Sequence, residues 1–239
     1  MHRRVARFSR RVAAAAAHLC GLATYPGKKD GLEAIERRLG WAAGLALIAI
    51  LACAGRPTPR EYFYRLELPA PEIVFEHAPL PGRVLIQRFD GGALYSQRAL
   101  LYSFRRSPAR IQQYHYHHWL EAPTELLAEA LAQYLRRASA ASTSITARHH
   151  LPADYEIAGY IRRFECILDP APAVIAVELE LSVKRNSDEE LLWLKTYSAE
   201  RASTGNKVGE AAEAFAAALA QIFGQFVGDL ANIYHHDAS

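Results

Sequence analysis

The sequence predicts an α+β domain in which an antiparallel sheet carries two amphipathic helices packed on one face. Three observations support this fold class: segments in which apolar and polar residues alternate, two helical segments with one apolar side each, and polar turns between successive strands. Elements with a single apolar face bury it most simply against each other, so the helices and the sheet form two layers. With 239 residues, the chain has room for one such domain and an N-terminal segment.

The strands are predicted from alternation and from the turn residues that separate them. In the segment 173–183, apolar residues occupy one side and Glu178 and Glu180 the other, which is typical of a half-buried strand. Phe164 interrupts the alternation of residues 157–161, which predicts a β-bulge near Arg162 and Arg163. The predicted strands are 62–66, 84–89, 99–104, 111–119, 155–168, 173–183 and 191–199, with a further short strand near the end of 139–146.

Two segments have the periodicity of amphipathic helices. Residues 123–138 begin with Pro123, which suits a first helical turn, and continue with apolar residues at three- and four-residue steps. Residues 207–232 have one apolar stripe along their whole length. We expect both stripes to lie in the core.

Charge is distributed unevenly along the chain. Residues 1–52 contain nine Lys or Arg and three Asp or Glu, a net charge of +6, whereas residues 53–239 contain nineteen and twenty-two, a net charge of −3. A nucleic-acid-binding domain needs a basic surface. The second segment has no overall basic excess, which disfavours a nucleic-acid partner.

The N-terminal segment has the pattern of a bacterial lipoprotein signal peptide. The apolar run 40–52 follows two arginines, is shorter than the roughly 20 residues of a membrane-spanning helix, and fits the hydrophobic region of a signal peptide. It ends at Ile50-Leu51-Ala52-Cys53, which resembles a lipobox, so Cys53 is the predicted lipid-attachment residue. The alternative is a short buried helix with a cysteine there by chance. Because Ala54, and not aspartate, follows Cys53, we expect sorting to the outer membrane on its periplasmic face.

These features divide the chain into four parts. Residues 1–52 are an N-terminal extension with the signal peptide, and the polar, proline-rich residues 53–61 are a tether. Residues 62–232 form the α+β domain, and residues 233–239 are a C-terminal tail.

The order of these features resembles the ABC-type transport auxiliary lipoprotein family, which includes PqiC-like proteins. The residues that carry the resemblance are Cys53, the aromatic run 62–66, the hairpin 98–119, the aromatic residues 116–119 ahead of Ala122 and Pro123, the strand with Ile157, Gly159 and Phe164, and the last helix from near Ala214. The resemblance implies a non-catalytic binding or scaffold component of an MCE-type or Mla-like system that moves lipid between two membranes. Its partners would be an MCE-domain substrate-binding protein and the permease and ATPase of that system, on separate chains, and a second copy of this chain is a further candidate partner.

The predicted partner-binding residues are the aromatic residues of the hairpin, because Tyr, Trp and Arg are favoured at interfaces and four arginines lie in the same region. These aromatic residues are Tyr102, Phe104, Tyr114, Tyr116 and Trp119. The alternative is that they are sheet core and cross-strand pairs. Trp119 is the clearest case, because it stands at the corner between a strand and a helix and is either packed there or exposed to a partner.

No sequence pattern indicates catalysis or a cofactor. The chain has no phosphate-binding Gly-rich loop with Lys and Ser or Thr, and no G-x-S-x-G motif. His115 and His117 are expected on one strand face with ligand spacing, but no cysteine or carboxylate pattern accompanies them, so we expect no metal site. Cys166 is expected to be a small buried residue.

Two alternatives to a scaffold stay open from the sequence. A lipid-carrying lipoprotein would need its own apolar cavity between sheet and helices. A periplasmic hydrolase or metal enzyme would need His115 or His117 to meet a distant carboxylate.

Overall fold

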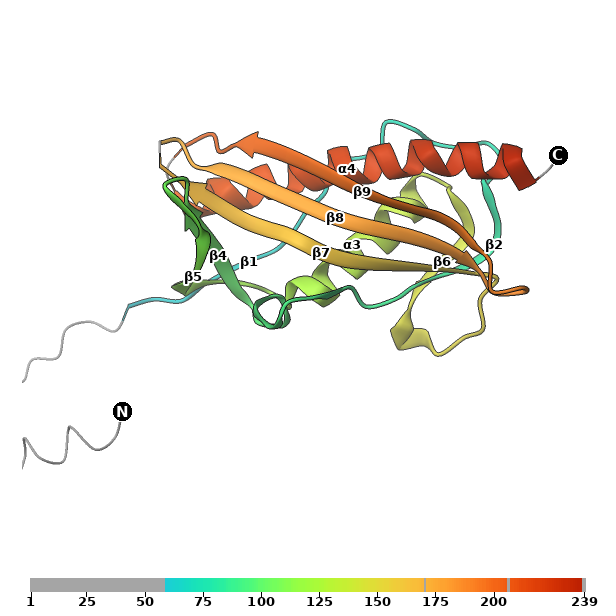
Figure 1. Cartoon of the computed structure of the whole chain (residues 1–239), viewed down its shortest axis with the longest axis horizontal. Coiled ribbons are helices and arrows are strands. Elements are labelled where there is room, and N and C mark those ends of the chain that lie inside the picture. The colour runs from blue at the N-terminus through green and yellow to red at the C-terminus, as the bar shows by residue number, and fades with distance from the viewer. Residues whose placement is uncertain (1–58, 170, 206, 238–239) are drawn as a thin grey trace, which may run out of the picture. The chain divides into compact units, whose positions relative to one another are not determined.

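The computed structural model describes residues 59–169, 171–205 and 207–237, with side chains up to residue 232. The predicted signal peptide, Cys53 and the first part of the tether lie outside these residues. The described part is an α+β unit in which one nine-stranded sheet packs against two long helices (Figure 1).

The elements follow the predicted order closely. The strands are β1 (Tyr62–Tyr64), β2 (Leu80–Ile86), β3 (Asp90–Gly91), β4 (Ala99–Phe104), β5 (Ser107–Trp119), β6 (Ala141–Thr146), β7 (Tyr155–Leu168), β8 (Val174–Arg185) and β9 (Leu191–Ala202). The helices are α3 (Pro123–Arg137) and α4 (Val208–Asp237), with short 3-10 turns η1 (Ala93–Ser96) and η2 (Ala147–His149). Helix α4 continues past residue 232 to Asp237, so most of the predicted C-terminal tail has a helical backbone.

The prediction of an antiparallel sheet was wrong, because the sheet is mixed. Antiparallel pairs join β4 to β5, β7 to β8 and β8 to β9, as the hairpin signals predicted. On the other edge of β7, however, β2, β3 and β4 pair with it one after another, all in parallel. Two outer strands are parallel to their neighbours as well, β6 to β2 and β1 to β5. Alternation shows which face of a strand is buried but not its direction, and these partners are distant in sequence.

Strand β7 is therefore the centre of the sheet, and it has the predicted bulge. Ile161 pairs with Leu179 of β8, but Arg163 pairs with the next residue, Glu178, so Arg162 is the additional residue. The bulge returns Phe164, 1% exposed, to the buried face that Ile157, 0% exposed, also occupies. Gly159 is required on this face, because a Cβ there would come within 2.5 Å of the Phe89 ring.

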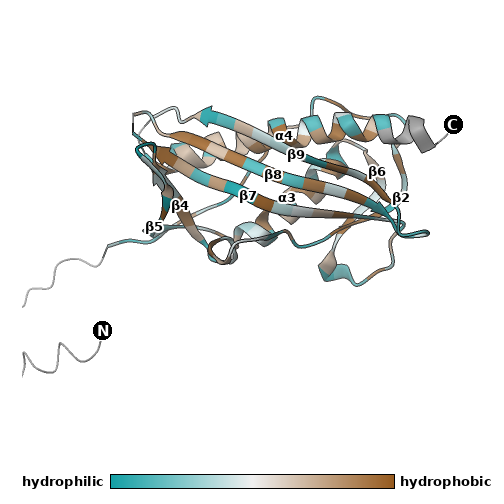
Figure 2. Ribbon diagram, in the orientation of Figure 1, coloured by the Kyte–Doolittle hydropathy of each residue, from teal (hydrophilic) through white to brown (hydrophobic). Residues whose placement is uncertain are grey.

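Both helices cover the same face of the sheet. Leu127, Leu131 and Leu135 of α3 are all 0% exposed, and so is the stripe of α4 formed by Leu219, Phe223 and Phe226. Figure 2 shows the alternation of apolar and polar residues along β7, β8 and β9 that leaves the opposite face polar. Residues Val208–Asn232 of α4 are long and apolar enough to cross a membrane, but 56% of the most apolar window is buried in this core. We therefore interpret α4 as a core helix.

Three aromatic rings connect the layers at one end of the domain. Trp119, at the end of β5, lies with its ring centroid 5.5 Å from that of Phe164 in β7 and 5.2 Å from that of Phe215 in α4. The Phe164 and Phe215 centroids are 4.4 Å apart. All three side chains are 1% exposed. We call this group the aromatic triad.

We predict that Trp119→Ala destabilises the domain by about 3–5 kcal/mol, because it leaves a cavity within the aromatic triad. This loss is a large share of the roughly 5–15 kcal/mol by which a typical domain is stable. The matched control is Leu120→Ala at the neighbouring residue, which is 47% exposed and should change stability by no more than about 0.5 kcal/mol. Urea unfolding followed by circular dichroism measures both variants. Equal stability of the two variants would contradict a structural role for Trp119.

Candidate functional site

The candidate site is the outer part of the sheet formed by β1, β4 and β5. We call residues 60–66 and 98–120 the wing. It contains all five aromatic residues predicted to bind a partner, and β4 connects it to the central strand β7. In Figure 1 the wing lies at one end of the domain and includes the first described strand, β1.

The structure separates the five predicted residues into three groups. Trp119 is buried in the aromatic triad, so it does not form part of an exposed docking face. Tyr102, Phe104 and Tyr114 are half-buried. Tyr116 alone among the five is exposed, at 43%.

The half-buried residues pack as rings on one another. The centroid of Tyr102 lies 5.8 Å from that of Phe104 and 4.6 Å from that of Tyr114. Tyr114 in turn lies 5.5 Å from His117, which stacks with Tyr62 at 5.2 Å. These contacts agree with the alternative of cross-strand packing, although part of each ring still reaches solvent.

A register shift in β5 explains why sequence alternation misplaced the histidines. Ala99 pairs with His118 while Leu101 pairs with Gln113, so two residues along β4 correspond to five along β5. As a result Tyr114 and His117, three residues apart, contact each other, whereas His115 is exposed. His117 thus belongs to a packed group of rings, whereas His115 is exposed and has no part in it.

Burial controls protonation inside this ring cluster. Desolvation, with a smaller contribution from the charge of His118, lowers the pKa of His117 below its usual value. The imidazole is therefore neutral near pH 7, and its Nδ1 forms a hydrogen bond of 2.7 Å with the Tyr64 hydroxyl. Burial also raises the pKa of Tyr64 and raises that of Tyr114 to about 12, so both hydroxyls keep their protons. The cluster is a neutral, packed unit that holds β1 on β5.

The edge of the wing exposes apolar side chains that sequence reasoning only partly identified. Tyr62 is 51% exposed, Phe63 49% and Leu120 47%. Their backbones are neighbours at one edge of the sheet, because Phe63 pairs with His118 and the Leu120 amide donates to the Tyr64 carbonyl at 2.9 Å. Tyr62 and Phe63 are consecutive in a strand, so their side chains extend from opposite faces of this edge. We call Tyr62, Phe63 and Leu120 the β1 edge. The aromatic run 62–66 indicated a short strand in the sequence. Nothing in the sequence indicated that this strand pairs in parallel with β5.

Among the described residues, neither a metal-binding group nor a reactive cysteine is present. No group of three or more His, Cys, Asp or Glu side chains in these parts of the chain is placed to hold a metal ion. Cys166 is 1% exposed, and burial, followed by the charge of Glu165, raises the pKa of its thiol to about 12, so it is not a ready nucleophile.

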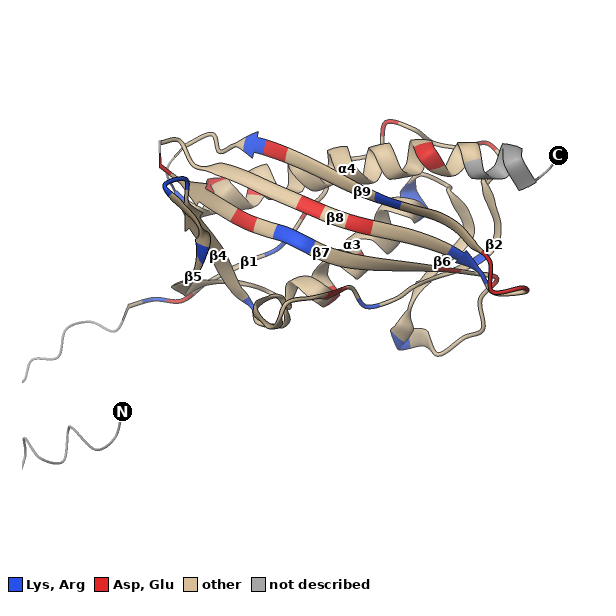
Figure 3. Cartoon of the chain, viewed as in Figure 1, with Lys and Arg blue, Asp and Glu red and all other residues tan. Residues whose placement is uncertain are grey.

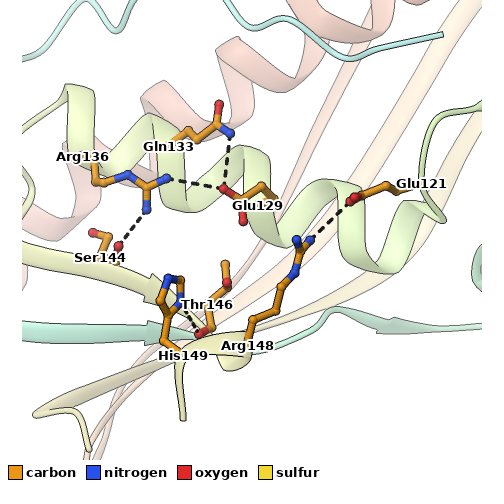
Figure 4. Close-up of polar contacts among 8 residues, drawn as sticks. All are labelled: Glu121, Glu129, Gln133, Arg136, Ser144, Thr146, Arg148 and His149. Atoms are coloured by element: carbon orange, nitrogen blue, oxygen red, sulfur yellow. Dashed lines mark hydrogen bonds and ion pairs between the residues drawn. The ribbon is translucent and has the colours of Figure 1, made fainter. Parts of the chain in front are cut away.

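The polar contacts around α3 are structural. Arg136 donates to the Ser144 carbonyl at 2.7 Å and lies 3.5 Å from Glu129, and Arg148 lies 3.4 Å from Glu121 (Figure 4). The first contact joins α3 to β6, the second lies within α3, and the third joins η2 to the turn that precedes α3. In each contact an arginine donates to a carbonyl or a carboxylate. None of these contacts pairs a nucleophile with a general base.

Two open grooves lie on the helix side, beside the segment 65–79 that connects β1 to β2. One, of about 470 Å³, is lined by residues 65–68 and the exposed side of α3. The other, of about 620 Å³, lies between residues 69–73 and a small-residue side of α4 that includes Ala217, Ala220 and Gly224. Arg137 holds the connecting segment by donating to the carbonyls of Leu68 and Pro69 at 3.1 and 3.0 Å. Both grooves lie outside the space between sheet and helices.

Comparison with known proteins agrees with the fold. The model of a family described as the ABC-type transport auxiliary lipoprotein component matches residues 84–231. The structure of protein XCC0632 from Xanthomonas campestris superposes with a TM-score of 0.63 and 18% identity, over 74% of this chain and 99% of that one. The structure of an uncharacterised protein superposes with a TM-score of 0.53 and 12% identity, over 73% of this chain and 98% of that one. A search of curated proteins gave no match.

Proposed function

This chain belongs to the ABC-type transport auxiliary lipoprotein family, and we propose that it acts as a lipid-anchored scaffold of an MCE-type or Mla-like lipid transport system. The observation that carries the proposal is that the family model covers residues 84–231, which include α3, α4 and most of the sheet. The lipobox-like sequence ending at Cys53 precedes this domain in the chain and is joined to it by the tether. We propose Cys53 as the acylated residue and the periplasmic face of the outer membrane as its location, the latter because Ala54 follows it.

A scaffold fits the core better than a carrier with a cavity between sheet and helices. That space holds the side chains of Phe164, Phe215, Phe223 and Phe226, each no more than 1% exposed. A closed acyl-chain site there would require these rings to move, and interiors packed to this degree resist such a change. The transported lipid would then pass through partner chains, for which we propose an MCE-domain protein with its own permease and ATPase.

We predict that Cys53→Ser releases the chain from the membrane fraction or leaves it as an uncleaved precursor, because serine provides no thiol for lipid attachment. Cell fractionation and the mass of the recovered protein measure this. Cys166→Ala is the control, because a buried thiol far along the chain should not affect anchoring. A Cys53→Ser protein that is cleaved and sediments like the parent would show that the anchor assignment is wrong.

We further predict that Tyr116 contributes to binding a protein partner of the transport system. Tyr116→Ala should reduce by several fold the MCE-domain protein, permease and ATPase recovered with the affinity-tagged chain after cross-linking in intact cells. Tyr160→Ala is a matched control, because Tyr160 on β7 is also 43% exposed but lies outside the wing. Quantitative mass spectrometry measures the recovery. Equal recovery with both variants would contradict docking through Tyr116, and recovery of none of these partners with the parent chain would contradict the proposed function.

A further inference from the structure

We propose that the wing rests on the anionic lipid surface to which Cys53 anchors the chain, with the β1 edge placed among the lipid headgroups. This inference rests on the lipid anchor of the proposed function. It adds a second contact with the bilayer, made by the folded domain itself. Three features support it: the exposed side chains of the β1 edge, the charge of the wing and the shortness of the tether.

The β1 edge has the composition of a membrane-interface contact. Tyr62 and Phe63 are about half exposed although aromatic side chains usually bury most of their surface, and Leu120 beside them is exposed to the same degree. Among the described residues, β1 pairs only with β5, so this apolar edge has no covering element there. Tyrosine is enriched where a bilayer meets water, because its amphipathic ring suits the headgroup region, and Phe and Leu are typical of the apolar side of interfacial elements.

The wing also carries the charge that attracts anionic lipid. It contains six arginines and one glutamate, a net charge of +5, whereas residues 53–239 together have a net charge of −3. All six arginines are exposed: Arg60, Arg65, Arg98, Arg105, Arg106 and Arg110. Figure 3 shows basic residues at the turn between β4 and β5, whereas β7, β8 and β9 carry both basic and acidic residues and α4 carries acidic ones. The positive charge is therefore concentrated on one part of an otherwise acidic domain.

These arginines remain available to lipid phosphates. Two of them form surface ion pairs, Arg65 with Glu67 at 3.7 Å and Arg106 with Asp169 at 2.7 Å, and their side chains are still 71% and 82% exposed. Exposed pairs of this kind are weak and exchange readily. The Arg98 guanidinium lies 5.7 Å from the Phe63 ring centroid, so a cation and an aromatic ring are presented together at the edge. A guanidinium can bind two phosphate oxygens at once, which suits it to phospholipid headgroups.

The tether keeps the wing close to the membrane. Tyr62 is nine residues after Cys53, so the chain between them spans at most about 30 Å. A short tether holds the wing at a high effective concentration beside the lipid surface, so weak contacts are sufficient. Acyl chains and a basic patch together are a recognised way to bind a membrane stably.

The test uses the acylated full-length chain in vesicles of phosphatidylglycerol and phosphatidylethanolamine that contain nitroxide-labelled lipid. A fluorophore is attached to Leu120→Cys in the β1 edge or, as a matched control, to Leu194→Cys on β9, whose parent residue is 57% exposed. Cys166, at 1% exposure, should stay unlabelled. We expect the label at residue 120 to be quenched at least threefold more strongly than the label at 194. Adding Tyr62→Ser and Phe63→Ser, or using neutral phosphatidylcholine vesicles, should remove most of this difference.

Flotation of the same vesicles separates the two proposals. A chain that floats with the vesicles but shows equal quenching at residues 120 and 194 is anchored without contact through the wing, and the inference is then wrong. If the chain does not float with the vesicles, the lipid anchor fails, and this inference fails with it. Stronger quenching at residue 120 that persists in neutral vesicles would contradict the role of the arginines.

Discussion

The aromatic triad of Trp119, Phe164 and Phe215 is the contact on which the arrangement of this domain depends. Each ring comes from a different part of the fold: the wing, the central strand β7 and the helix layer. The wing joins the rest of the sheet through the short pairing of β4 with the last residues of β7, between Tyr102–Phe104 and Cys166–Leu168. The angle between neighbouring strands varies from about −10° to −35°, so such a short pairing alone does not fix the orientation of the wing. Large aromatic side chains bury much apolar surface in a fixed geometry, so the triad sets how the wing meets the helices.

Much of this arrangement could be predicted from the sequence because it depends on local patterns. The strand β7 has the predicted bounds, helix α3 begins at the predicted Pro123, and the bulge lies at Arg162 because only an additional residue returns Phe164 to the buried face. The direction of the strands could not be predicted in the same way. Three segments between residues 80 and 104 pair with one edge of β7, some 60 to 75 residues later, and no turn motif marks such a parallel contact.

The sequence placed the five aromatic residues in one hairpin, as the structure does, but it did not predict how deeply each one is buried. Trp119 lies at the corner between a strand and a helix, and the structure places it in the core, as the structural alternative required. Tyr102, Phe104 and Tyr114 are half-buried because the register shift in β5 brings Tyr114 towards His117, which simple alternation places on opposite faces. The exposure of Phe63 follows from the place of β1 at the outer edge of the wing. If that edge meets the lipid surface, the triad also determines how the anchored domain is oriented, because it fixes the wing against α4.

Hydrogen exchange of Phe215→Leu tests most directly whether the triad holds the wing in place. Although residue 215 belongs to α4, we expect faster exchange of the amides of β1 and of the end of β5 as well as those of α4. Phe226→Leu is the control, because this residue packs on Tyr197 of β9 with ring centroids 5.9 Å apart and should loosen β9 without affecting β1. Faster exchange confined to α4 in Phe215→Leu, or the same effect on β1 in both variants, would contradict the account.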